Sequence, residues 1–79
     1  YANGRPDIIV SKGEFRAAIE IETGKSDPPA NVLKNLSAGF PIVIVVPTSQ
    51  TAHNQILKQL QAIGLLENSQ VQVVPAKAF

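Results

Sequence analysis

A continuous run of β-branched residues near the middle of the chain restricts the fold more than any other feature. Residues 42–46 read Ile-Val-Ile-Val-Val, and Pro41 precedes them. A run that is apolar at every position, rather than at every second one, is typical of a strand covered on both faces. It is far too short to cross a bilayer. We therefore predict a strand inside an α/β sheet.

Helical patterns lie on both sides of this run. The sequence predicts one helix over about 29–38, capped by Ser26 or Asp27, and a second over about 50–63. A last strand is predicted over 71–74. The apolar positions are Val32, Leu33 and Leu36 in the first helix, and Ala52, Ile56, Leu57, Leu60 and Ile63 in the second.

The first part of the chain reads as a β-hairpin. Residues 7–10 form a short apolar run, 11–14 contain turn residues, and the strict alternation at the end of 15–22 indicates the returning strand. The predicted order is β-β-α-β-α-β. It implies a mixed α/β sheet, with parallel pairing after the hairpin and helices on its faces.

The hairpin is predicted to gather three carboxylates on one face. If the turn is centred at 12–13, Asp7 lies opposite Ala18, and Glu20 is its diagonal neighbour. Glu22 shares that face because strand side chains repeat with period two. The isoleucines that alternate with these glutamates are then expected to point to the other face, towards apolar cover.

Three carboxylates this close repel one another unless protons or a cation intervene. Hard oxygen ligands suit Mg²⁺ or Mn²⁺, which can polarise a phosphate and lower the pKa of an attacking water. Lys25, just behind the carboxylates, is placed to stabilise the charge that develops. The pattern favours metal-assisted hydrolysis of a phosphate ester.

Pro6-Asp7, the hairpin, Ile19-Glu20-Ile21-Glu22 and the following helix together resemble the PD-(D/E)xK nuclease superfamily. The resemblance covers about residues 5–74. It implies a restriction-endonuclease-like fold and a Mg²⁺- or Mn²⁺-dependent DNA endonuclease that hydrolyses phosphodiester bonds. Asp7 matches the family aspartate and Glu20 the (D/E), so Asp7, Glu20 and Glu22 are the expected metal ligands.

The chain departs from the family pattern where a lysine is usual, because Glu22 stands there. Either Glu22 does the work of that lysine at the attacking water, or Lys25 reaches back to do it. A family helix that normally precedes the Pro-Asp pair is also missing. The alternative function is a catalytically degenerate module of the same fold, used for DNA binding or assembly.

The resemblance also implies that the helix after the hairpin contacts DNA. Asn31, Lys34 and Asn35 share one helical face, opposite or oblique to the apolar positions, and are expected there; a plain exposed face is the alternative. With the loop before the helix, the expected DNA-binding residues are Lys25, Ser26, Asn31, Lys34 and Asn35.

Simpler interpretations stand beside these. The glutamates can be a solvated strand face, and Asp7 can be ordinary turn chemistry after a proline. Thr-Gly-Lys-Ser suggests a phosphate-binding loop, but Ile19 occupies the position of the earlier glycine. A nucleotide-binding or receiver-like domain is disfavoured because those folds open with strand–helix alternation. His53 has no other histidine or cysteine to form a zinc site and is expected on the surface.

Composition limits the setting. The 79 residues suffice for one domain, and because the chain starts at Tyr1 we expect 1–79 to be a piece excised from a larger protein. A net charge of +1 means that other domains or further subunits of a homo-oligomer are expected to supply much of the attraction to DNA. There is no cysteine, which fits a cytoplasmic protein, and no membrane association is expected.

Overall fold

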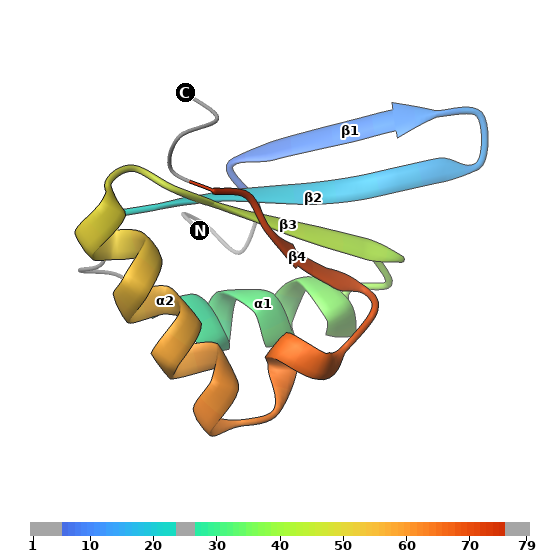
Figure 1. Ribbon diagram of the computed structural model, residues 1–79. Coiled ribbons are helices and arrows are strands. Elements are labelled where there is room, and N and C mark those ends of the chain that lie inside the picture. The colour runs from blue at the N-terminus through green and yellow to red at the C-terminus, as the bar shows by residue number, and fades with distance from the viewer. Residues whose placement is uncertain (1–5, 24–26, 76–79) are drawn as a thin grey trace.

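The computed structural model describes residues 6–23 and 27–75, which form one mixed four-stranded sheet and two α-helices (Figure 1). The predicted order β-β-α-β-α-β is confirmed, with a short 3-10 helix added before the last strand. No helix within these ranges is long and apolar enough to cross a membrane. The elements are β1 (Ile8–Lys12), β2 (Phe15–Glu22), α1 (Pro28–Ser37), β3 (Ile42–Pro47), α2 (Gln50–Ala62), η2 (Leu65–Glu67) and β4 (Val71–Val73).

The hairpin of β1 and β2 turns one residue later than predicted. Gly13 has a φ of 61°, the left-handed region that the first position of a favoured two-residue hairpin turn requires. Lys12 pairs with Phe15 across this turn. The predicted turn centre at 12–13 is therefore wrong. It would place Lys12 at the first turn position, where a glycine such as Gly13 adopts a positive φ without strain and a lysine does not.

The later turn changes the register of the hairpin. The pairing is shifted by two residues, so continuing the ladder past its last pair brings Asp7 level with Glu20 and not with Ala18. Since side chains alternate with period two, a shift of two leaves each of them on its predicted face. The aspartate thus comes closer to the first glutamate than the predicted diagonal arrangement placed it.

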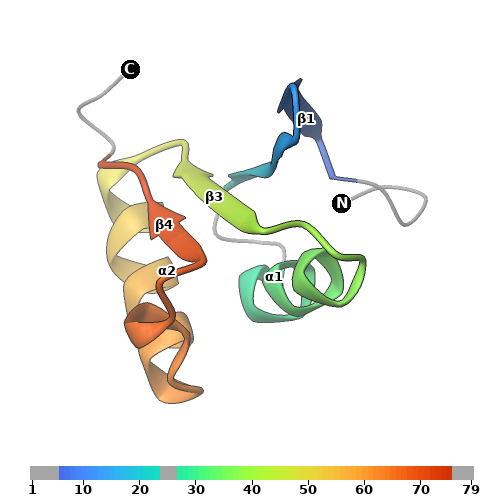
Figure 2. The ribbon, with the colours of Figure 1, turned by 90° about the vertical axis from the view of Figure 1, so that its right-hand side faces the viewer.

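After the hairpin the chain crosses over twice, each time through a helix. β3 runs parallel to β2, and β4 runs parallel to β3, which confirms the predicted pairing. The strand order β1-β2-β3-β4 means that both crossovers move in the same direction across the sheet. Crossovers of this kind share one hand, so both helices lie on one face, as Figure 1 and Figure 2 show. The expectation of helices on both faces is wrong.

The core fills the space between the sheet and the two helices. Ala18 of β2 and Val43 and Val45 of β3 are fully buried there. The predicted stripe of α2 packs against them mainly through Ile56 and Leu60. The whole apolar core consists of Ala18, Val32, Phe40, Val43, Val45, Ala52, Ile56, Leu60, Leu65 and Val71.

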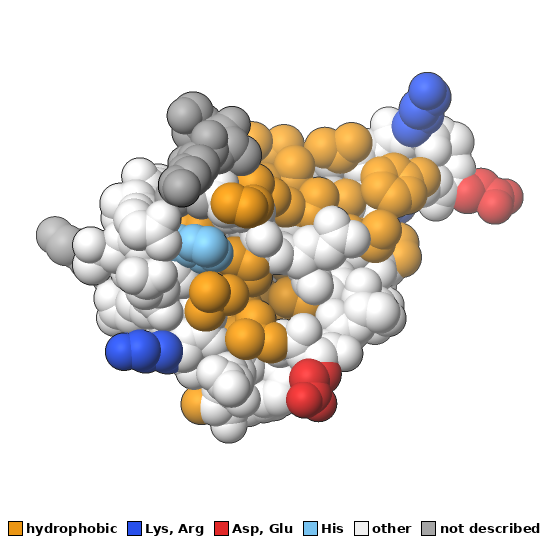
Figure 3. All heavy atoms as spheres, in the orientation of Figure 1, with side chains coloured by type: hydrophobic (Ala, Val, Ile, Leu, Met, Phe, Trp, Pro, Cys, Tyr) orange, Lys and Arg blue, Asp and Glu red, His pale blue; other side chains and the backbone are white. Residues whose placement is uncertain are grey.

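The other face of the sheet carries exposed apolar side chains. Figure 3 shows a band of hydrophobic atoms along the hairpin. Ile21, which was expected to face apolar cover, exposes 46% of its surface. In the run 42–46 only Val43 and Val45 are buried. The predicted cover on both faces is therefore absent from the described part of the chain, because both helices cover the same side.

Helix α1 begins with a side-chain cap that the sequence predicts. The Asp27 carboxylate accepts a hydrogen bond from the Ala30 N–H at 3.2 Å. We expect Asp27→Ala to lower the free energy of unfolding by about 1 kcal/mol because an N–H of the first turn loses its partner. Urea unfolding measures this, and Asp27→Asn, which keeps an acceptor, serves as control. Equal losses in both variants would contradict the capping role.

Candidate functional site

Two glutamates of β2 point into the interior of the domain. Glu20 is 0% exposed and Glu22 is 1% exposed, on the face that the helices cover. They lie level with Val45 and Pro47 of β3. This is the carboxyl end of two parallel strands, where open α/β sheets form their ligand sites. The simpler interpretation of a solvated strand face is therefore wrong for both.

Helix α1 gives each glutamate a hydrogen-bond donor. Asn35 Nδ2 donates to Glu20 Oε2 at 2.9 Å, and Asn31 Nδ2 donates to Glu22 Oε1 at 3.0 Å. Asn35 is 0% exposed and Asn31 is 8% exposed. Because a buried carboxylate without donors is strongly disfavoured, these two bonds help to make the packing of α1 on this end of β2 possible.

The side of α1 that faces the sheet differs from the predicted one, and the two asparagines lie on it. The helix buries Asn31, Val32 and Asn35 together, whereas Leu33 is 48% exposed. The predicted grouping, with the leucine inside and both asparagines on an exposed face, is wrong because the buried glutamates need donors. In this arrangement the side chains of Asn31 and Asn35 are engaged with the sheet rather than presented to DNA.

Asp7 approaches the glutamates from the beginning of β1. Its Oδ2 accepts a hydrogen bond at 2.9 Å from the backbone N–H of Ile21, the residue between Glu20 and Glu22. The bond spans 14 positions in sequence, so it joins the two strands and differs from the local turn chemistry that a Pro-Asp pair suggests. Asp7 is thereby fixed next to the end of the strand that carries the glutamates.

The surroundings of Glu20 shift the protonation of its carboxyl. Burial raises the pKa of the Glu20 carboxyl above its ordinary value, and the hydrogen bond from Asn35 acts in the opposite direction. The carboxylates of Asp7 and Glu22 raise the pKa of Glu20 further because like charges repel. Burial and the two neighbouring carboxylates thus all favour the neutral form of Glu20.

One buried oxygen beside the glutamates, on Asn35, lacks a hydrogen-bond donor within the part of the chain that the structure describes. Asn35 Oδ1 is buried, and no group in the described ranges donates a hydrogen bond to it. A buried polar atom without a partner costs about 1–3 kcal/mol. Asn35 thus supplies the buried Glu20 with a donor through its nitrogen, at the cost of a buried oxygen that has no donor among the described residues.

The carboxylate oxygens are suitable ligands for the expected metal ion, but they are not arranged as a complete metal site. Asp7, Glu20 and Glu22 offer oxygen atoms only, which suits Mg²⁺ or Mn²⁺. Within residues 6–23 and 27–75, however, no three Asp, Glu, His or Cys side chains are arranged so that they could hold a metal ion. The described residues thus supply suitable ligand atoms without a formed metal site.

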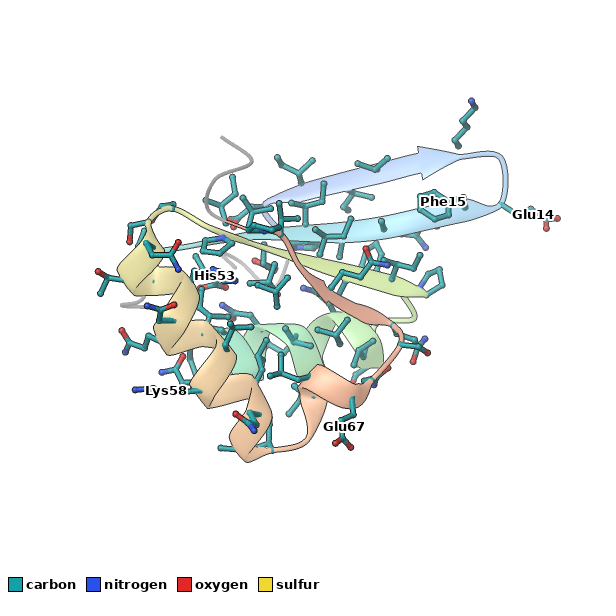
Figure 4. All side chains as sticks on the ribbon, in the orientation of Figure 1. Glu14, Phe15, His53, Lys58 and Glu67 are labelled. Atoms are coloured by element: carbon teal, nitrogen blue, oxygen red, sulfur yellow. The ribbon has the colours of Figure 1, made fainter. Side chains whose placement is uncertain are left out.

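The other predicted site residues lie elsewhere or outside the described ranges. Lys25 and Ser26 are not among the described residues, and Lys34 is on the exposed side of α1. His53, expected on the surface, is half-buried in the first turn of α2, with its Nδ1 3.4 Å from Gln50 Nε2. His53, labelled in Figure 4, belongs to α2, whereas the asparagines belong to α1.

The sequence analysis missed that the two asparagines pair with the glutamates. The signal is their spacing: the glutamates are two positions apart on a strand, and the asparagines four positions apart on the next helix. Four residues of helix rise about 6 Å, and two residues of strand rise about 6.6 Å. The two pairs can therefore form side by side when the helix packs on the strand.

Comparison with protein-family models, with curated proteins and with solved structures found no match to this chain. Its function is accordingly inferred from its residues and their geometry.

Proposed function

We propose that this chain is the nuclease domain of a metal-dependent DNA endonuclease with the restriction-endonuclease-like fold. The observation that carries the proposal is the placement of three carboxylates at one end of the hairpin, where Glu20 and Glu22 are buried on one face of β2 and Asp7 accepts a hydrogen bond from the backbone N–H between them. Such a group repels itself near neutral pH, and a divalent cation relieves the repulsion. The order of hairpin, helix and parallel strands supports the same conclusion.

The roles of the residues follow from their chemistry. Mg²⁺ or Mn²⁺, when bound, would polarise the phosphodiester and lower the pKa of the attacking water. Asp7 and Glu20 would hold the ion through carboxylate oxygens. Glu22 or Lys25 would orient the water or stabilise the charge that develops on the phosphate. Glu22 already has a fixed orientation through Asn31, which favours it for the positioning of a small molecule.

Contact with DNA would depend on residues that precede α1 in sequence and on the outer side of this helix. Lys25, Ser26 and Lys34 are the remaining candidates for phosphate contacts. A net charge of +1 provides little long-range attraction for a polyanion. Further domains of a longer chain or a second subunit would supply the rest.

The test combines cation binding with DNA cleavage. Wild-type protein is titrated with Mg²⁺ and with Mn²⁺ by calorimetry and incubated with plasmid DNA in the presence of each ion. We expect binding and cleavage, and Glu20→Ala should reduce the cleavage rate by about 100-fold or more. Glu67→Ala changes an exposed glutamate of η2 and His53→Ala changes the lone histidine; both should cleave as wild type does.

A second function is favoured by the burial of the glutamates. Both already accept hydrogen bonds from α1, as expected for a catalytically degenerate module that uses this fold for DNA binding or assembly. In that case the wild type binds neither ion and leaves plasmid DNA intact. Glu20→Ala then retards DNA on a gel, or forms the same oligomer, as the wild type does. That result would contradict the nuclease proposal.

A further inference from the structure

The sheet has a second face, which neither α1 nor α2 covers (Figure 2). Ala18, Val43 and Val45 point away from it into the core, so alternate positions of the strands point towards it. These outer positions are apolar in three strands. We call them the open face, and they are Ile8 and Val10 in β1, Phe15, Ala17, Ile19 and Ile21 in β2, and Ile42, Ile44 and Val46 in β3.

The most exposed part of the open face lies on the hairpin. Ile8, Val10, Phe15 and Ile21 each leave between 41% and 46% of their surface exposed, and the members from β3 are half-buried. The open face therefore presents on the order of 500 Å² of apolar surface, which is the size of the largest patch on a typical monomer and often marks an interaction site.

The open face is nearly free of charge. Among the described outer positions of β1, β2 and β3 only Lys12 is charged, and it lies at the hairpin tip, paired with Phe15. A strongly acidic or basic partner would find little complementary charge on such a surface. A neutral apolar surface is, in contrast, complementary to itself. Two-fold dimers require this property because both subunits use the same patch.

The dimensions of the open face favour a second sheet as its partner. β2 has 8 residues and is about 26 Å long, and three neighbouring strands are about 14 Å wide. One extended segment of chain covers a width of only about 5 Å. A second open face covers the whole area at once, and the two together bury about 1,000 Å², the lower limit for a specific interface.

We propose that the open face binds the open face of a second copy of this chain, so that two sheets pack face to face in a two-fold dimer. The hairpins lie on one another with their β1 strands antiparallel, which brings the most exposed side chains of both copies together. The two copies of Lys12 then lie at opposite ends of the interface, roughly 14 Å or more apart, beyond the screening length of about 10 Å. The inference is independent of the proposed nuclease function, because Glu20 and Glu22 lie on the other face of the sheet.

The experiment measures self-association of the whole chain. Sedimentation equilibrium from about 5 to 500 µM covers the dissociation constants expected of a small interface, and thermal unfolding is recorded at both ends of this range. Val10→Thr adds a hydroxyl to the open face with a residue that strands favour, and Val10→Lys adds a charge. Leu33→Lys makes a matching change on the exposed side of α1. Circular dichroism confirms folding, and the wild type is also sedimented with phosphatidylcholine vesicles.

We expect the wild type to show a reversible monomer–dimer equilibrium and a melting temperature that rises with protein concentration. Val10→Thr should weaken the association by about 10-fold, because each dimer loses two apolar contacts. Val10→Lys should be monomeric at every concentration, since two charges would be buried without partners. Leu33→Lys should associate as the wild type does.

Three results would overturn the inference. A wild type that remains monomeric up to about 500 µM has no dimer of useful strength, and its binding to vesicles would show that the open face takes lipid instead. A dimer that Val10→Lys leaves intact, or that Leu33→Lys disrupts as strongly, would place the interface elsewhere. If Val10→Lys fails to fold, an unchanged dissociation constant of Val10→Thr contradicts the proposal in its place.

Discussion

Replacing Glu20 by glutamine is expected to stabilise the metal-free domain at pH 7 and, at the same time, to abolish metal-dependent cleavage. The glutamate is fully buried and its pKa is raised by burial first and by Asp7 and Glu22 in addition. Glutamine keeps the shape and can still accept the hydrogen bond from Asn35, but it does not ionise. We expect a gain in the free energy of unfolding of about 1 kcal/mol and a cleavage rate at least about 100-fold lower.

The pH dependence of this effect has a defined sign. The ordinary pKa of the group is 4.5, and the folded state raises it. Below pH 4.5 the folded and unfolded states both carry the proton, and the stability contributed by the group is fully present. As the pH rises through the raised folded pKa, that contribution is lost because the folded protein must ionise a buried carboxyl. The advantage of Glu20→Gln should therefore be absent near pH 4 and larger at neutral pH.

Urea unfolding in the presence of EDTA at pH 4 and pH 7 measures both expectations. Glu67→Gln removes an exposed carboxylate and should leave the unfolding curve unchanged at both pH values. A Glu20→Gln variant that is less stable than wild type at pH 7 would contradict the interpretation of Glu20 as a destabilised buried acid.

Truncating Leu60 in the core is expected to bring the domain close to unfolding. Leu60 is 0% exposed and contacts the centre of the core from α2. Leu-to-Ala changes at such sites cost about 2–5 kcal/mol, whereas a domain of this length has a total stability of about 4–12 kcal/mol. A loss of 3 kcal/mol would lower the melting temperature by roughly 12–24 °C.

The matched control is Leu33→Ala, which makes the same chemical change on the exposed side of α1. It should shift the melting temperature by only a few degrees, about 0.5 kcal/mol in stability. Thermal unfolding followed by circular dichroism compares the two variants. If Leu33→Ala were as harmful as Leu60→Ala, α1 would be oriented as the sequence predicts and not as the structure has it.

The elements of the fold were predictable because their signals are local. The alternating end of β2 identifies a half-buried strand, and the predicted bounds 15–22 agree with the structure. Asp27 and the prolines after it identify the beginning of α1 within one residue. These features depend on the chain near each residue, so one sequence contains enough information to find them.

The register and the faces were not predictable by the same means. The sequence Ser-Lys-Gly-Glu allows Gly13 at either position of a two-residue turn, and only the structure shows that it takes the first one, where φ is positive. The orientation of α1 depends on two buried glutamates on another element. By hydrophobicity Leu33 belongs inside and Asn35 outside; the hydrogen bond between Asn35 and Glu20 reverses this.

Some of the geometry of the candidate site was predictable, but the hydrogen-bond partners of its acids were not. Period two placed Glu20 and Glu22 on one face of β2, where both are buried, and Asp7 accepts a hydrogen bond from the backbone N–H between them; their role as metal ligands stays a prediction. The asparagines were assigned to an outer surface because a polar residue on a helix is usually exposed. Only the packing of α1 against β2 shows that their partners are acids.

The strand order β1-β2-β3-β4 has a consequence for how the chain acquires its structure during synthesis. Each strand pairs with the strand that precedes it in sequence, so every partner has already left the ribosome when the next strand emerges. Both glutamate–asparagine pairs lie within residues 20–35, and the strand on their other side ends at Pro47. The strands and helix that carry these pairs are thus all available before α2 and β4 are translated, but the pairs are held in place only when these later elements complete the core.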